Sequence, residues 1–77
     1  MKMDYQEIKM VMRADARLAN GLVNLLQDDT KQICIDVDDF DLFSLNEALR
    51  EAKRTAQSLL DTVNKLEHDL QIAKEFA

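Results

Sequence analysis

The stretch from Ser44 to Phe76 contains neither glycine nor proline and carries its apolar residues in a heptad pattern. Two rows at seven-residue spacing run through it: Leu45, Ala52, Leu59, Leu66 and Ala73 form one, and Leu49, Ala56, Val63, Leu70 and Ala77 form the other. Alternating steps of four and three residues place both rows on one helix face, which is typical of a coiled coil. Further apolar residues widen this face and favour a bundle of more than two helices, namely Ala48, Leu60, Ile72 and Phe76.

A local pattern predicts where this helix begins. Ser44-Leu45-Asn46-Glu47 matches a capping box, in which the Ser44 hydroxyl accepts from the Glu47 backbone N–H and the Glu47 carboxylate reaches back to the Ser44 N–H. The heptad follows directly after it. The sequence therefore predicts one long helix over residues 44–76.

A second helix is predicted over residues 4–27, where apolar residues fall on one face at helical spacing: Ile8, Val11, Met12, Leu18, Ala19, Leu22, Leu25 and Leu26. Gly21 follows Asn20 inside this segment, and glycine costs about 1 kcal/mol relative to alanine within a helix. The apolar spacing keeps its phase across Gly21. We therefore expect a continuous or mildly bent helix, with Gly21 at a close helix contact.

Asp15 is the exception on this apolar face, and a buried carboxylate is costly unless it has a partner. Three interpretations are open. Asp15 caps a second helical segment that begins at Ala16, or it is paired inside the bundle and fixes the register of the helices, or it lines a ligand or partner site.

The segment 28–43 holds six acidic residues and one basic residue, so its charge of −5 equals the net charge of the whole chain. Within it, Ile33-Cys34-Ile35-Asp36-Val37 alternates between apolar and other residues, which predicts a short strand. A lone strand needs a partner. It would pair with its copy across a dimer axis, lie over the helices as a lid, or add to a sheet of another protein.

Two phenylalanines and a leucine, Phe40, Leu42 and Phe43, end the acidic segment. We expect them to close the end of the helix pair, as a hydrophobic staple does before a helix cap. The alternative is an acidic and aromatic docking motif for a partner protein.

The fold class that follows is all-α. A helix over 4–27, a 16-residue acidic connection and a helix over 44–76 form an antiparallel hairpin, and residues 1–77 form one domain. The second helix outruns the first by roughly 15 Å and leaves an apolar overhang. Self-association would cover it, as a homodimeric four-helix bundle or a higher oligomer. The predicted oligomer interface is Leu59, Leu60, Val63, Leu66, Leu70 and Phe76.

Composition disfavours several functions. The chain has one cysteine, one histidine and one glycine, so a disulfide framework, a metal cluster of Cys34 and His68 and a glycine-rich phosphate loop are not expected. Direct nucleic-acid binding is disfavoured by the acidity. No apolar run approaches the ~20 residues of a membrane span. We expect a cytoplasmic protein that is not an enzyme and needs no cofactor.

The predicted function is that of a small regulator, adaptor or inhibitor that acts by protein–protein interaction. Its oligomeric scaffold would present the acidic segment to a basic partner, such as a nucleic-acid-binding protein, through Asp36, Asp38, Asp39, Phe40, Asp41 and Phe43. The alternative is a small-ligand-binding oligomer whose sites lie between protomers. In that case Asp15, or the basic flank of Lys9, Arg13 and Arg17, would supply the polar contacts.

Overall fold

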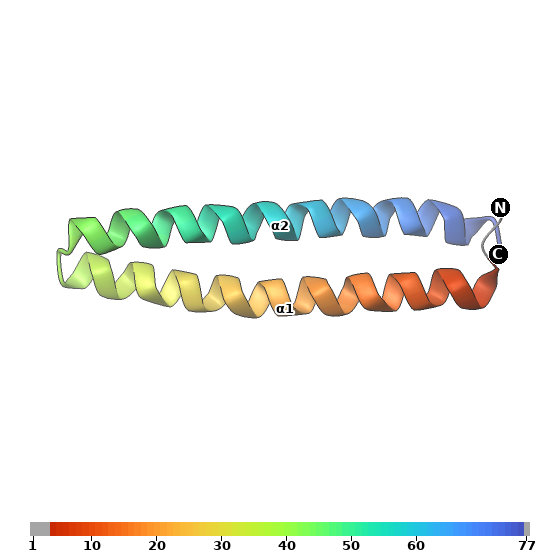
Figure 1. Ribbon diagram of the computed structural model, residues 1–77, viewed down its shortest axis with the longest axis horizontal. Coiled ribbons are helices and arrows are strands. Elements are labelled where there is room, and N and C mark those ends of the chain that lie inside the picture. The colour runs from red at the N-terminus through yellow and green to blue at the C-terminus, as the bar shows by residue number, and fades with distance from the viewer. Residues whose placement is uncertain (1–3, 77) are drawn as a thin grey trace.

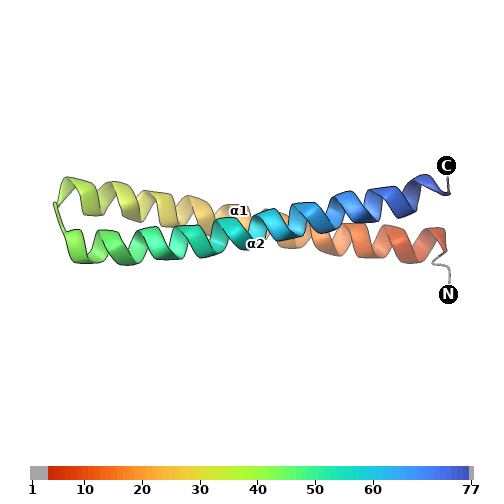
Figure 2. The ribbon, with the colours of Figure 1, turned by 90° about the horizontal axis from the view of Figure 1, so that it is seen from above.

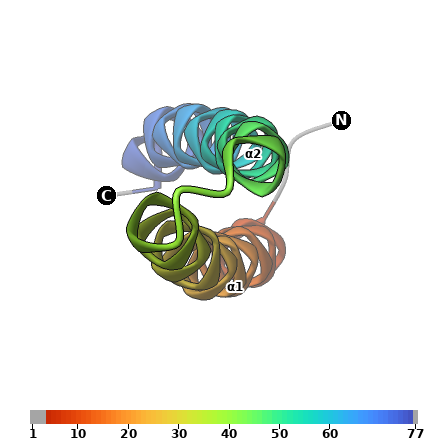
Figure 3. The same cartoon turned by 90° about the vertical axis from the view of Figure 1, so that its left-hand side faces the viewer.

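The computed structural model describes residues 4–76 and shows two long antiparallel helices, α1 (Tyr5–Asp38) and α2 (Leu42–Lys74) (Figure 1). The hairpin measures 54 × 16 × 14 Å, and the start of α1 and the end of α2 lie at the same end of it. Figures 2 and 3 show that the helices cross and wind around each other, as heptad-patterned helices do. The prediction of an all-helical hairpin is confirmed.

α1 continues through the segment for which a connection and a strand were predicted. Residues 28–38 are helical, and the turn between the helices consists of Asp39, Phe40 and Asp41. Both the 16-residue connection and the strand at Ile33–Val37 are therefore wrong. A helix satisfies its backbone hydrogen bonds within the segment, whereas a lone strand leaves them unpaired.

The turn is tight because Phe40 takes a left-handed backbone conformation with φ of 52°. The N–H of Asp41 donates to the carbonyl of Asp36 at 2.9 Å, which closes the end of α1. The helices have nearly the same length, 34 and 33 residues. The predicted overhang of α2 therefore does not exist, and the end of α2 lies beside the start of α1 (Figure 1).

Aspartates cap both helices. Asp4 accepts from the backbone N–H of Glu7 at 2.8 Å, and Asp41 accepts from the backbone N–H of Ser44 at 3.1 Å. The predicted capping box at Ser44 is wrong, because α2 begins two residues earlier. A carboxylate at Asp41 is the better cap, since its negative charge also interacts favourably with the N-terminal end of the helix dipole.

Two rows of residues on each helix form the seam between α1 and α2. On α2, one row is the predicted Leu45, Ala52, Leu59, Leu66 and Ala73, all partly buried. The second row is Ala48, Thr55, Thr62 and Asp69, all buried. The predicted second row is wrong for this seam: Leu49, Ala56, Val63 and Leu70 are exposed, and Ala77 lies outside the described residues.

The partners on α1 explain this choice of row. The facing row of α1 contains Asp15, Asp29 and Asp36 at seven-residue steps through Leu22. A carboxylate that leaves water needs polar partners, and Thr55 supplies one to Asp29 across the seam, which leucine or valine could not do. The seam is consequently polar: in the described part of the chain the buried apolar residues are Ile8 and Ala48, against five buried polar ones. No helix among the described residues is long and apolar enough to span a membrane.

Gly21 lies in the middle of α1, and a Cβ added there would meet nothing within 4 Å. The expected close helix contact is absent at this position. We predict that Gly21→Ala raises the free energy of unfolding by about 1 kcal/mol, because alanine loses less backbone freedom on forming the helix. Thermal denaturation followed by circular dichroism should show a midpoint higher by roughly 4–8 °C. Ala14→Gly, seven residues earlier on the same exposed face of the helix, should lower the midpoint by a similar amount, and an unchanged midpoint in both variants would contradict the prediction.

Candidate functional site

The predicted partner-binding residues gather at the turn end of the hairpin. Asp38 ends α1, Asp39 and Phe40 lie in the turn, and Asp41 and Phe43 lie at the start of α2. Phe40 and Phe43 are 77% and 78% exposed. The expectation that Phe40, Leu42 and Phe43 close the end of the helix pair is therefore wrong, because a three-residue turn leaves them pointing into solvent.

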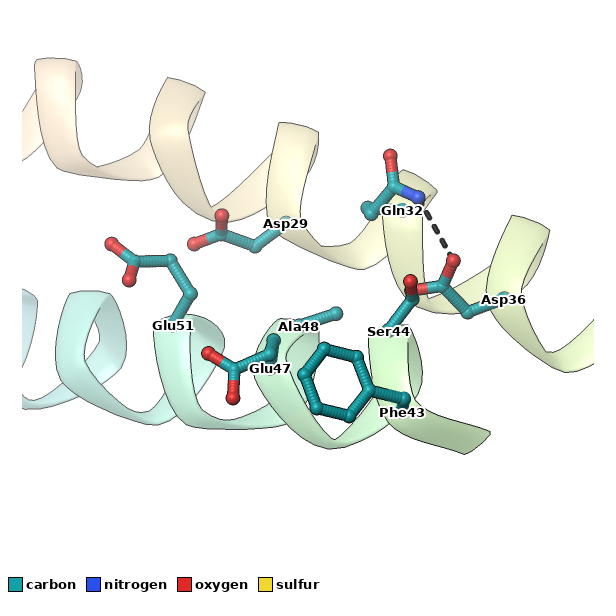
Figure 4. A pocket seen from close by; sticks show the side chains of 8 residues that line it. All are labelled: Asp29, Gln32, Asp36, Phe43, Ser44, Glu47, Ala48 and Glu51. Carbon is teal, nitrogen blue, oxygen red and sulfur yellow. Dashed lines mark hydrogen bonds between the residues drawn. The ribbon is translucent and has the colours of Figure 1, made fainter. Parts of the chain in front are cut away.

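Asp36 differs from the other acidic residues of this end, because it is only 4% exposed. It lines a pocket of about 430 Å³ between the end of α1 and the start of α2 (Figure 4). The pocket is lined by Asp29, Gln32, Asp36, Phe43, Ser44, Glu47, Ala48 and Glu51. Four of these eight residues are carboxylates and none is basic, so the lining of the pocket is acidic.

Each carboxylate of the pocket can still accept at least one further hydrogen bond. The Asp36 Oδ1 accepts from the Gln32 side chain at 2.9 Å, while its buried Oδ2 has no hydrogen-bond partner. One oxygen of Asp29 accepts from the Thr55 hydroxyl at 2.9 Å across the seam. Glu47 and Glu51 form ion pairs with Arg50 and Arg54 at 4.0 and 3.6 Å, and exposed pairs of this kind contribute about 0–1 kcal/mol each.

The Asp41 carboxylate has a fixed role in this end of the hairpin. The Ser44 backbone N–H that it accepts lowers the pKa of Asp41 below the ordinary value, because the hydrogen bond favours the charged form. Asp41 is therefore an ionised helix cap at neutral pH. Its charge adds to the negative charge of the pocket lining.

A second acidic cluster lies in the other half of the hairpin and joins Asp15 to Asp69 and Lys65. Asp15 is 5% exposed and Asp69 is 4% exposed, and Lys65 Nζ lies 3.2 Å from Asp15 Oδ1. Asp15 lies within the continuous helix α1 and does not cap a new segment. Its side chain is held inside the hairpin by residues of α2.

Asp15 and Asp69 face each other inside the hairpin, and their pKa values shift in opposite directions. The hydrogen bond with Asp69, together with Lys65, lowers the pKa of Asp15. The hydrogen bond with Asp15, then burial and the negative charge of Asp15, raise the pKa of Asp69. Two adjacent carboxylates cannot both ionise at little cost, so the pair holds one proton more readily than isolated aspartates do.

The other residues singled out from the sequence lie apart from these clusters. Cys34 and His68 are exposed. Lys9, Arg13 and Arg17 are exposed on α1, and the Lys9 ammonium lies 5.8 Å from the centroid of the Tyr5 ring. Within residues 4–76 no group of three or more histidine, cysteine, aspartate or glutamate side chains is arranged to hold a metal ion.

The predicted oligomer interface divides into two sets. Leu59 and Leu66 are partly buried in the seam of the hairpin itself, while Leu60, Val63, Leu70 and Phe76 are exposed. The second set lies on surface that another molecule can cover.

Sequence reasoning did not identify Asp29, Gln32, Glu47 and Glu51 as pocket residues, nor Asp69 as the partner of Asp15. A signal for the seam was present, because Asp15, Leu22, Asp29 and Asp36 repeat at seven residues and so do Ala48, Thr55, Thr62 and Asp69. If residues 33–37 are taken as helix instead of strand, the two rows can be placed opposite each other in an antiparallel pair.

Comparisons with protein-family models, with curated proteins and with solved structures found no match to this chain. The proposals below therefore depend on the geometry and chemistry of this hairpin alone.

Proposed function

We propose that this chain is a non-enzymatic interaction protein: its hairpins self-associate, and the assembly presents the acidic turn end to a basic partner protein. A hairpin only 16 × 14 Å in cross-section offers outer surface for contacts and little enclosed interior for chemistry. The observation that carries the proposal is an apolar flank that the hairpin leaves exposed.

The apolar flank consists of residues that directly follow the buried row on each helix. In an antiparallel helix pair, the positions that directly follow the buried row of one helix lie on the same side of the seam as those that directly follow the buried row of the other helix. Six of them are large apolar residues that are 39–59% exposed, namely Val23, Val37, Leu42, Leu49, Val63 and Leu70. The flank thus draws on both helices and runs along most of the hairpin.

The exposed area of the chain supports a partner of substantial size. The accessible surface is 6093 Å², whereas a compact monomer of this mass exposes roughly 4,800 Å². The excess of roughly 1,300 Å² is larger than the ~800 Å² that each partner buries in a standard interface. A single pair of helices with a polar seam also supplies little core of its own.

A second copy of the hairpin is the occupant that fits this flank. Two copies related by a two-fold axis would bring their flanks together as a four-helix bundle, and each flank would supply the apolar surface that the other requires. The pocket lies on the opposite side of the seam, because its residues Gln32 and Glu51 follow the buried row by three positions instead of one. Self-association on the apolar flank therefore leaves the acidic pocket free.

We predict that sedimentation equilibrium at tens of micromolar gives a mass of at least twice 8.9 kDa. Val63→Glu, in the centre of the apolar flank, should weaken self-association at least tenfold, because it would bury a charge in the interface. Asn64→Glu is the matched control: it adds the same charge at the next residue, on the outer face of α2, and should leave the mass unchanged.

A folded wild-type monomer at these concentrations would contradict the proposal. An equal loss of mass in Val63→Glu and Asn64→Glu would also contradict it, since a general effect of added charge would then explain the result. Circular dichroism of both variants, measured at the same concentration, checks that the helices persist.

A further inference from the structure

We propose that the pocket at the turn end binds the guanidinium group of an arginine side chain from a partner protein. The pocket is the one lined by Asp29, Asp36, Glu47 and Glu51 (Figure 4). This inference rests on the proposed function, because it names the chemistry by which the acidic end recognises a basic partner. Its test uses a peptide and does not depend on self-association.

The buried Asp36 offers a hydrogen-bond acceptor that no described residue of the chain satisfies. Asp36 is only 4% exposed, and its Oδ2 is buried without a hydrogen-bond donor, as are the Oδ2 atoms of Asp15 and Asp69. Of these three aspartates, Asp36 is the one that lines the pocket. Buried carboxylate oxygens normally have donors, because leaving water without one is unfavourable. A cationic donor that enters the pocket would supply both the hydrogen bond and the opposite charge.

The arrangement of the other carboxylates favours an extended cation with several donors. In Figure 4 the Asp29 and Glu51 side chains approach from the two helices on one side of Ala48, and Asp36 lies beside Ser44 on the other. No three carboxylates among residues 4–76 are close enough to bind one metal ion. A planar guanidinium with five N–H donors can reach acceptors that are spread in this way.

Phe43 adds a second kind of contact. Its ring lines the pocket and is 78% exposed, so it presents an aromatic face beside the carboxylates. Guanidinium groups stack on aromatic rings more readily than ammonium groups do. The exposed ion pairs of Glu47 with Arg50 and of Glu51 with Arg54 are weak, and an incoming cation can replace them.

The test is a titration of the full chain with a capped Gly-Arg-Gly-Arg-Gly peptide, followed by NMR chemical shifts or calorimetry at low salt. We expect saturable binding whose shifts centre on the pocket residues. Asp36→Asn should weaken binding at least fivefold, because it removes the buried charge while it keeps the shape of the side chain. Asp28→Asn is the matched control, since it removes the same charge from an exposed position of α1 outside the pocket, and it should weaken binding less than twofold.

A second variant keeps the test valid if Asp36→Asn changes the fold. Glu51→Gln removes a pocket charge from an exposed position and should weaken binding two- to fivefold. Equal losses in Asp36→Asn and Asp28→Asn would overturn the site in favour of unspecific attraction to an acidic chain, and so would the absence of saturable binding.

Two further probes define the ligand. A capped Gly-Lys-Gly-Lys-Gly peptide should bind at least threefold more weakly than the arginine peptide, and equal affinity would overturn the assignment to guanidinium. Free spermidine is the second probe. If it bound more tightly than the arginine peptide, and if this binding also depended on Asp36, the result would overturn the proposal that the cation belongs to a protein side chain. Val63→Glu should bind the arginine peptide as wild type does, so that failure of the site is distinguishable from failure of self-association.

Discussion

Asp69→Leu should raise the free energy of unfolding by about 1–4 kcal/mol at pH 7, which is the range found when buried charged groups are replaced together by apolar residues of similar volume. Asp15 keeps its ion pair with Lys65 in this variant, so no unpaired charge is left behind. Asp69 is 4% exposed and faces the carboxylate of Asp15, so ionisation of both residues places two adjacent negative charges in the seam with one lysine. Leucine removes one of these charges and fills a buried heptad position. Thermal denaturation at fixed protein concentration measures the change.

The pH dependence of stability distinguishes this explanation from a simple gain in packing. The pKa of Asp69 is raised in the folded chain, so its contribution is fully present below the ordinary value of 3.8 and is lost as the pH rises through the raised pKa. The pKa of Asp15 is lowered, so its contribution is present above 3.8 and is lost as the pH falls through the lowered pKa. The pair is therefore most favourable near pH 4.

We expect wild type to lose stability as the pH rises from about 4, and Asp69→Leu to lose this part of the dependence. Glu67→Leu is the matched control, because it removes the same charge from an exposed position on the same helix, and it should change stability by less than about 0.5 kcal/mol. A destabilised Asp69→Leu, or an unchanged slope with pH, would show that the two carboxylates do not interact as described.

Leu59→Asp should unfold the hairpin. Leu59 is partly buried in the middle of the seam, where an aspartate would lose the leucine packing and place an unpaired charge between the helices. The expected cost of about 3–5 kcal/mol is comparable to the whole stability that a chain of this size derives from one core. The far-ultraviolet circular dichroism signal should therefore fall to that of a largely unfolded chain.

Leu60→Asp provides the comparison, because Leu60 is the next residue and is 53% exposed. This variant should keep most of its helical signal, since the side chain lies outside the seam. A cooperative melting transition retained in Leu59→Asp would show that the seam does not contain this row.

Part of the candidate site was accessible from the sequence. The concentration of charge in residues 28–43 identified the acidic end, and Asp36 was among the residues chosen there. The other pocket residues Glu47 and Glu51 were not identified, because they come close to Asp36 only when α2 folds back beside α1. The strand predicted at Ile33–Val37 obscured this, since short alternating stretches satisfy strand and helix periodicities almost equally.

The sequence by itself determined that this chain forms two amphipathic helices in a hairpin, because helical periodicity and the absence of proline act within each segment. It did not determine which heptad row faces the partner helix. The rows containing Thr62 and Val63 are adjacent, and one residue corresponds to a rotation of about 100°. Only the tertiary structure decided that the polar row is buried, because the Asp29 carboxylate of α1 needs a hydrogen-bond donor across the seam and Thr55 of this row supplies it. The same rotation left the apolar row on the surface, where a second copy can cover it.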